Sequence, residues 1–191
     1  MQPMEMKLVA ALKQGDRNAC AELVKRFSPH VYNVALRLVG EPTEAEEVLQ
    51  ETFINACRKV EGFEGRSSLA TWLYRIATNN SLMRLRQRRL PTVSLDESQG
   101  SEEDLPAPQE IADWEWDPDH LILTEEAYRV LTEAVESLPE TLRAAFVLRD
   151  LEGLSTQEAA EVLGISPAAL KVRLHRARLL LRERLSPYFS E

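Results

Sequence analysis

The last part of the sequence carries basic side chains at the spacing of one helix. Between positions 166 and 184 there are six lysines and arginines and a single acid. The opposite face is apolar, with residues spaced by four, three and four: Leu170, Leu174, Ala177 and Leu181. Such spacing makes the buried stripe of an amphipathic helix. Basic groups opposite the stripe can bind phosphate oxygens and reach guanine edges, so the chemistry indicated is nucleic-acid recognition.

The residues just before this helix complete a helix-turn-helix pattern. Ala160 supplies the small residue needed where two helices touch, and Gly164, four positions later, supplies the turn. Ile165 and Leu170 then follow as buried aliphatic positions. A generic helical hairpin would explain the apolar positions but not the basic far face, so we interpret the second helix as one that reads DNA.

The exposed side of that second helix is the expected DNA-reading surface. Its candidate DNA-binding residues are Lys171, Val172, Arg173, His175, Arg176 and Arg178. Val172 can touch a thymine methyl, whereas Arg173 and Arg178 lie nearer the flanks and are expected to hold phosphates. His175 is explained equally well as an exposed histidine without a base contact.

A second basic cluster lies nearer the N-terminus. Positions 66–89 hold six arginines and no acid. The whole chain of 191 residues has a net charge of −8, and without the two clusters 11 bases face 30 acids. Two local positive patches on an acidic protein favour contact with phosphate at chosen places and suppress indiscriminate DNA binding.

No catalytic, metal or cofactor site accompanies these patches. The three histidines are scattered, and the sequence has no glycine loop of the phosphate-binding kind and no nucleophile paired with a base. Cys20 and Cys57 lack CxxC spacing and a nearby histidine pair, so we expect buried free thiols rather than a disulfide or a zinc site. We therefore expect a protein that binds rather than an enzyme, without metal or cofactor.

The sequence also indicates the compartment. It has no run of about 18 apolar residues and no signal-peptide pattern at its start. We expect a cytoplasmic protein without membrane insertion.

The segments that position these side chains are predicted to be helices, because none shows the alternation of polar and apolar residues that is typical of a strand. Three helices are predicted in the first 90 residues, with N-capping signals at their starts. The signals are Asp16, a capping box of Thr43 with Glu46, and Ser67 or Ser68. The first of these helices is expected to end near Gly40, and a loop at 62–65 precedes the third.

Four shorter helices are predicted after residue 120. The first spans 121–136, and the others begin at the boxes Ser137 with Glu140 and Ser155 with Glu158, and at Ser166 followed by Pro167. Between the two groups, positions 91–120 hold four prolines, ten acids and no lysine or arginine, which is typical of a linker. Trp114 and Trp116 within this linker suggest docking to an unidentified surface. The prediction is an all-α protein of two small domains, 1–90 and 121–191, joined by an acidic flexible linker at 91–120.

Several motifs resemble the sigma-70 family of bacterial transcription factors. SLPE at 137–140, LEGLS at 151–155, EAA at 158–160, LKVRLHRAR at 170–178 and LRERL at 181–185 resemble the family's fourth conserved region. EEVLQETF at 46–53 resembles its polymerase-binding helix. FEGRSS at 63–68 and TWLYRIATN at 71–79 resemble the segment that recognises and melts the minus-ten promoter element. With no further domain between the two regions, the chain resembles the extracytoplasmic-function class.

The resemblance implies roles for particular residues. The expected polymerase-binding residues are Glu46, Glu47, Gln50, Glu51 and Phe53. The expected minus-ten residues are Phe63, Arg66, Ser67, Ser68, Trp72, Arg75, Asn79, Arg84 and Arg86. The helix at 166–184 would read the minus-thirty-five element. The implied partners are core RNA polymerase, promoter DNA and an anti-sigma factor.

The residues leave some alternatives open. Glutamates such as Glu46 usually form a solvated face, and Trp72 fits a core position as well as the edge of an opened duplex. Val172 and Met83 depart from the family pattern. Val172 replaces a polar residue that faces the DNA groove, so the usual upstream promoter sequence is in question. Met83 stands where many relatives have an acid, so the packing near the melted strand is in question. A stand-alone activator using the same helix-turn-helix is the main alternative function; an activator, however, needs a sensor pocket or a dimer interface in place of an arginine-rich first domain.

Overall fold

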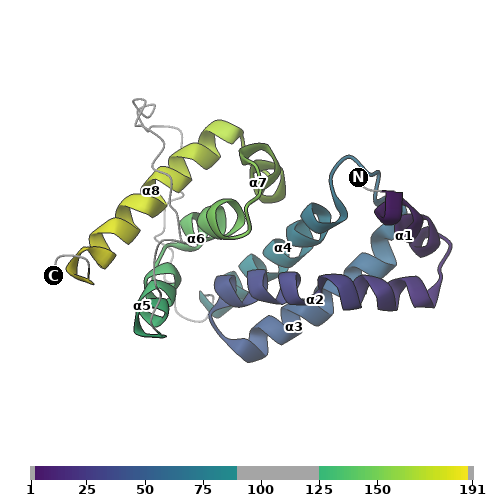
Figure 1. Ribbon diagram of the computed structural model, residues 1–191, viewed down its shortest axis with the longest axis horizontal. Coiled ribbons are helices and arrows are strands. Elements are labelled where there is room, and N and C mark those ends of the chain that lie inside the picture. The colour runs from purple at the N-terminus through teal and green to yellow at the C-terminus, as the bar shows by residue number, and fades with distance from the viewer. Residues whose placement is uncertain (1–2, 90–124, 189–191) are drawn as a thin grey trace.

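The computed structural model describes residues 3–89 and 125–188, which are helical without any strand in these ranges. The helices of the first domain are α1 (Pro3–Lys13), α2 (Arg17–Val39), α3 (Pro42–Lys59) and α4 (Leu69–Arg89) (Figure 1). Those of the second are α5 (Glu125–Glu136), α6 (Glu140–Phe146), α7 (Thr156–Leu163) and α8 (Pro167–Leu185). The predicted all-α fold of two helical domains is confirmed. The predicted linker, with Trp114 and Trp116, lies outside the described residues.

The start of α2 follows its local signals, whereas α3 begins earlier than predicted. Asp16 Oδ1 accepts a hydrogen bond from the Asn18 amide at 2.8 Å, as expected of an N-cap. The predicted box of Thr43 with Glu46 is wrong, because Glu41 caps α3 by accepting from the Glu44 amide at 3.0 Å. Pro42 is already in the first turn, where its fixed φ and missing N–H suit a helix start.

The predicted capping box at the start of α6 is also wrong. Ser137 turns back to the preceding helix, and its hydroxyl donates to the Ala134 carbonyl at 2.5 Å. Pro139 occupies the N-cap position and has no side-chain acceptor to offer. A π-helical segment, η4 (Val147–Leu151), then continues the chain from α6.

The core of the first domain lies between α2, α3 and α4. Its fully buried side chains include Leu23 and Val31 of α2, Val48 of α3, and Leu69 and Leu73 of α4. Helix α1, which the sequence analysis did not predict, adds the buried side chains Leu8 and Leu12 to this core. The start of α4 and the loop before it, where the first basic cluster begins, therefore rest on a packed bundle.

The expectation of two free thiols is wrong, because Cys20 and Cys57 form a disulfide with their Cα atoms 6.1 Å apart. The short connection at residues 40–41 makes α2 and α3 an antiparallel hairpin. The start of α2 therefore meets the end of α3, and two cysteines 37 residues apart in sequence come within bonding range. Sequence spacing alone carries no sign of this contact.

Reduction of this disulfide is expected to lower the free energy of unfolding by about 2 to 4 kcal/mol, because the bond restricts a loop of the unfolded chain. Thermal melting with and without a thiol reductant measures the difference. The double variant Cys20→Ser/Cys57→Ser is the control and should melt at the same low temperature in both conditions. An equal melting temperature of the wild type with and without reductant would contradict this expectation.

The core of the second domain extends into the first. Phe146, Val147, Leu148 and Leu170 are completely buried there. The same apolar cluster contains Val34 and Leu38 of α2 and Tyr74 of α4. The domains therefore pack side by side, with α5, α6 and α7 on the side that faces α2 and α4 (Figure 1).

Candidate nucleic-acid and protein interfaces

The helix-turn-helix geometry predicted around Gly164 is confirmed. The Ser155 hydroxyl accepts from the Glu158 amide at 3.2 Å, and Glu158 Oε2 accepts from the Ser155 amide at 3.0 Å, which completes the capping box of α7. Hydrogen bonds from Ser155 hold the pKa of Glu158 below its usual value. Gly164 ends α7 with φ 67°, a left-handed conformation that glycine adopts at low cost. Ala160 is buried where the two helices meet.

Helix α8 begins as predicted and presents two different faces. The Ser166 hydroxyl accepts from the Ala169 amide at 3.1 Å, and Pro167 is the first helical residue. The predicted stripe is buried along the whole helix: Leu170, Leu174, Ala177 and Leu181. On the other side Lys171 is exposed, and four candidate DNA-binding residues are half-buried: Val172, Arg173, His175 and Arg176.

Arg178, the last of the candidate DNA-binding residues in α8, has a partner inside its own domain. Its guanidinium forms two hydrogen bonds to Asp150 of η4, both 2.9 Å long. The Asp150 side chain is only 5% exposed, so the arginine neutralises a carboxylate that is nearly removed from water. This paired geometry favours a role for Arg178 in joining η4 to α8, and its phosphate contact stays a prediction.

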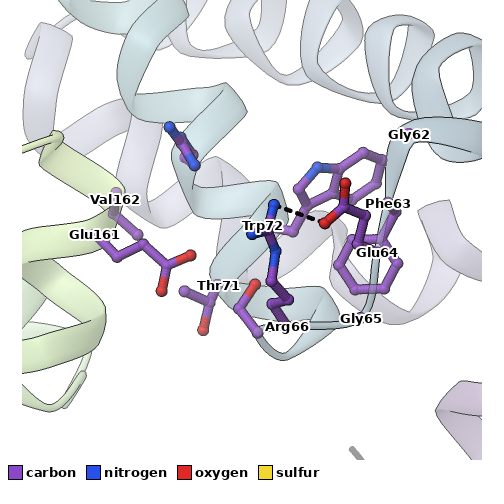
Figure 2. A pocket seen from close by; sticks show the side chains of 11 residues that line it. Gly62, Phe63, Glu64, Gly65, Arg66, Thr71, Trp72, Glu161 and Val162 are labelled. Atoms are coloured by element: carbon purple, nitrogen blue, oxygen red, sulfur yellow. Dashed lines mark ion pairs between the residues drawn. The ribbon is translucent and has the colours of Figure 1, made fainter.

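A cavity of about 440 Å³ lies where the first basic cluster begins. From the first domain it is lined by Gly62, Phe63, Glu64, Gly65, Arg66, Ser67, Thr71, Trp72 and Arg75. The rings of Phe63 and Trp72 pack with centroids 5.0 Å apart, and Arg66 pairs with Glu64 at 2.6 Å (Figure 2). The wall that the first domain contributes thus combines an aromatic pair, two arginines and hydroxyl groups, a composition suited to a base and its phosphate, whereas Glu161 and Val162 of α7 line the other side.

The predicted minus-ten residues do not all lie at this cavity. Ser68 acts as the cap of α4, because its hydroxyl accepts from the Thr71 amide at 3.0 Å. Asn79 and Arg86 are exposed further along α4. Arg84 forms ion pairs with Glu47 and with Glu51 of α3, the latter at 2.7 Å. Arg84 therefore joins α4 to α3, at a distance from the cavity along the helix.

The predicted protein-binding face of α3, its acidic face, is largely exposed, but one of the residues predicted for it is buried. Glu46, Glu47 and Gln50 are exposed and Glu51 is half-buried. The expectation that Phe53 belongs to this surface is wrong, because its ring is only 6% exposed and packs in the core of the first domain. The apolar side chain on the surface is Ile54, which is 50% exposed.

Sequence reasoning missed Ile54, although helical spacing could have indicated it. Positions 47, 50 and 54 follow at three and four residues and so share one side of α3. A second arginine of α4 supports the same helix: Arg88 pairs with Glu44 and also donates to the Val39 carbonyl at 3.3 Å. The acidic face of α3 is thus held in place by two arginines from α4, Arg84 and Arg88.

Neither a metal site nor a membrane span is found among the described residues. In 3–89 and 125–188, no group of three or more histidine, cysteine or acidic side chains is arranged to hold a metal ion. Over the same residues, no helix combines the length and apolar character that crossing a bilayer requires.

Comparisons with known proteins match both domains. Residues 23–90 match the family model Sigma-70 region 2, and residues 128–181 match the model Sigma-70, region 4. The ECF RNA polymerase sigma factor SigW of Bacillus subtilis is 32% identical over 97% of this chain and 98% of its own. The ECF RNA polymerase sigma-E factor of Escherichia coli K12 is 35% identical over 94% of this chain and 93% of its own.

Two solved structures resemble this chain over most of its length. CnrH in complex with the cytosolic domain of CnrY superposes with a TM-score of 0.67 at 25% identity, over 96% of this chain and 97% of that one. The sigma factor RpoE of Bartonella quintana, in complex with the anti-sigma factor NepR, superposes with a TM-score of 0.60 at 25% identity, over 87% of this chain and 96% of that one.

Proposed function

Since this chain belongs to the sigma-70 family and to its extracytoplasmic-function class, we propose that its two domains divide promoter recognition between them. Sigma factors of this family direct core RNA polymerase to promoters. In our proposal residues 1–90 bind polymerase and open the minus-ten element, residues 121–191 read the minus-thirty-five element, and residues 91–120 connect them. The family acts by binding, as a subunit of a cytoplasmic polymerase.

One observation carries the proposal. The cavity at Phe63 and Trp72 lies within the match to region 2, and the basic face of α8 lies within the match to region 4. Each family region therefore contains a surface whose chemistry suits nucleic acid. Two such surfaces on one chain fit a protein that reads two separate DNA elements.

The cavity suits a base that has left the duplex. An extruded base can stack against an aromatic ring, and Trp72 is half-buried beside the cavity with Phe63 packed behind it. Arg66 and Arg75 are exposed at the same hollow and would attract the phosphates on either side of that base. Asn79, exposed further along α4, is proposed to read a base edge on the opened strand.

The acidic face of α3 is proposed as the contact to core polymerase. It presents Glu46, Glu47, Gln50 and Ile54 to solvent, so it combines charge with one apolar side chain. An apolar centre within a polar surround is the usual composition of a protein interface. The ion pairs of Arg84 keep Glu47 and Glu51 in place before the partner arrives.

Transcription with purified components tests the proposal as a whole. The protein is added to core RNA polymerase with a library of genomic fragments, and the 5′ ends of the transcripts are mapped. We expect transcription start sites that share two upstream DNA elements and that are not used when the protein is left out. Starts that do not depend on the protein, or that share no element, would refute the function.

The combined variant Glu46→Arg/Gln50→Arg is expected to weaken binding to core polymerase by about tenfold or more, since like charges across an interface cost at least about 1.4 kcal/mol. Both side chains are exposed, so the fold should be unaffected. Glu22→Arg, a charge reversal at an exposed position of α2 outside this surface, is the control and should bind as the wild type does. Equal retention of the combined variant and the control in a pull-down with core polymerase would rule out this surface.

The two solved neighbours suggest an inhibitor. CnrH is described with the cytosolic domain of CnrY, and RpoE with the anti-sigma factor NepR. We propose that this chain, too, is held by an anti-sigma factor until a signal releases it. Affinity purification of the tagged protein from unstressed cells, followed by mass spectrometry, should recover a protein that blocks transcription by the reconstituted holoenzyme.

A further inference from the structure

The disulfide of the first domain joins the ends of two helices. Cys20 lies in the first turn of α2 and Cys57 in the last turn of α3, with their Cα atoms 6.1 Å apart. Both side chains are half-buried at the edge of the apolar core, so a soluble thiol can reach the bond. They are the only two cysteines of the chain, so no third thiol of this protein competes for either one.

Such a bond is unusual in a protein with the proposed function. Core RNA polymerase works in the cytoplasm, where the thiol pool keeps most cysteines reduced. Cytoplasmic disulfides are usually transient and serve catalysis or redox sensing. A cysteine pair within bonding distance and within reach of solvent can therefore exist in two states, as the disulfide seen here and as two thiols.

The chain that follows Cys57 leads directly into the cavity of the first domain. Helix α3 passes into a 3-10 turn, η1 (Val60–Gly62), and the Phe63 amide donates to the Val60 carbonyl at 3.0 Å. Val60 and Phe63 are each only 3% exposed, and residues 62–67 then line the cavity. The last turn of α3 therefore sets where this wall of the cavity begins.

Packing connects the two sulfur atoms to the aromatic pair of the cavity. Cys20, Cys57, Val60, Phe63 and Trp72 belong to one apolar cluster, and α1 packs on both α2 and η1 at this end of the domain. Interior packing is dense, so a shift at one contact is passed to its neighbours. Without the bond, the end of α3 and η1 keep only apolar contacts to α2, and a short 3-10 turn at a helix end opens locally at low cost.

We propose that Cys20 and Cys57 form a thiol–disulfide switch that controls recognition of the opened minus-ten strand. In the oxidised protein the bond holds η1 and the following loop in the form that keeps Phe63 packed behind Trp72. In the reduced protein this segment opens locally, and the cavity is formed for only part of the time. The effect on DNA rests on the proposed function, whereas the redox chemistry of the pair does not.

The reducing reaction is thiol–disulfide exchange with a dithiol of the cytoplasm. A thiolate of the dithiol attacks one sulfur of the pair, which forms a mixed disulfide and releases the other cysteine as a thiolate. The second thiol of the reductant loses its proton and displaces the remaining cysteine, and both released thiolates take up protons. The reductant leaves as a disulfide, having given up two electrons and two protons.

Hydrogen peroxide supplies the oxidising direction. One cysteine thiolate displaces hydroxide from peroxide and becomes a sulfenic acid, and the other thiol condenses with it to form the disulfide and release water.

A redox titration tests whether the pair switches. The purified full-length protein is equilibrated in glutathione buffers from strongly reducing to fully oxidised, and free thiols are then alkylated with a maleimide whose mass is resolved on a gel. We expect two free thiols per chain in the most reducing buffer and none in the oxidised one. A disulfide that persists in a buffer as reducing as the cytoplasm would refute the switch, and so would thiols that stay reduced in oxidised glutathione.

Hydrogen exchange followed by mass spectrometry locates the structural change. On reduction, amides of residues 57–68 are expected to exchange about tenfold faster or more, while those of α8 exchange as before. The variant Cys20→Ser/Cys57→Ser should show the same increase without any reductant, which assigns the change to the bond. Unchanged exchange at 57–68, or equal acceleration throughout α2, α3 and α4, would refute local opening of this segment.

The consequence for promoters is measured with the holoenzyme. Oxidised wild type, reduced wild type and the serine double variant are each assembled with core polymerase, and opening of a mapped promoter is followed by a fluorescent base in its minus-ten element. If the reduced protein forms the cavity about one-tenth of the time, half-maximal opening should need about tenfold more holoenzyme. The double variant should match the reduced wild type in both buffers, which excludes an effect of the reductant on core polymerase.

The outcomes distinguish the steps of the inference. Equal opening by oxidised and reduced wild type, or a response of the double variant as large as that of the wild type, would refute control of the cavity by the bond. If the double variant loses its helical circular dichroism, the reduced wild type alone decides the comparison. Failure of the proposed function would appear separately, as holoenzyme without specific start sites in either redox state, while the titration and exchange results stand.

Discussion

Arg178→Met is expected to lower the free energy of unfolding by about 3 kcal/mol, since it leaves the carboxylate of Asp150 without its counter-charge in a nearly dry position. The arginine makes two hydrogen bonds to Asp150, and the loss of either partner leaves the other unsatisfied. Urea unfolding followed by circular dichroism measures the change. Destabilisation should be seen in the absence of any DNA, which separates this role from phosphate binding.

A double variant provides the control for this ion pair. Asp150→Leu/Arg178→Met removes both charges and keeps apolar volume, so it should regain much of the stability that Arg178→Met loses. If Arg178→Met unfolds at the same urea concentration as the wild type, the pair with Asp150 contributes nothing, and the arginine is better assigned to DNA.

Leu174→Ala is expected to cost about 2 to 5 kcal/mol through lost burial and the cavity left behind. Leu174 is 5% exposed and belongs to the apolar cluster at the centre of the second domain. The whole free energy of unfolding of a small domain is about 5 to 15 kcal/mol, so this single change removes a large share of it. Thermal melting should show a marked loss of stability.

Arg176→Ala, two residues further along α8, is expected to impair DNA recognition and to leave stability nearly unchanged. Its side chain is half-buried on the opposite side of the helix, so the melting temperature should stay close to that of the wild type. If Arg176 reads a guanine, discrimination at one promoter position should fall by about 1 to 3 kcal/mol. A phosphate contact would instead weaken every promoter alike and reduce the salt dependence of binding. Equal destabilisation by both changes would show that the two faces of α8 are wrongly assigned.

Several features set by residues close together in sequence were correctly predicted. The capping box of Ser155 with Glu158, the left-handed Gly164 and the start of α8 at Ser166 depend on hydrogen bonds within a few residues. The buried stripe of α8 follows from helical periodicity alone. The prediction failed where two capping signals lay close together. Helix α3 begins at Pro42 with Glu41 as its N-cap, and not at the capping box that was predicted at Thr43.

Features that depend on which helices meet could not be predicted in this way. Two arginines of similar sequence context, Arg176 and Arg178, differ because only Arg178 comes opposite Asp150 of η4. Arg84, predicted to bind DNA, pairs with glutamates of α3 that lie more than 30 positions earlier. The family resemblance placed Phe53 on a binding surface, whereas the packing of α3 into the core of the first domain buries its ring and leaves Ile54 exposed.

The sequence by itself determined most of the helices, the caps at Asp16, Ser155 and Ser166, the two basic clusters and the family, because each of these depends on residue type at short spacing. The tertiary structure alone decided the disulfide of Cys20 with Cys57 and the contact of Glu152 with Arg37, which is 115 positions away. Such contacts depend on the relative placement of whole helices, which packing of apolar faces sets. Charged residues at the interface cannot be recognised from the neighbouring sequence, because a solvated glutamate and a buried, paired glutamate occur in the same kind of local sequence.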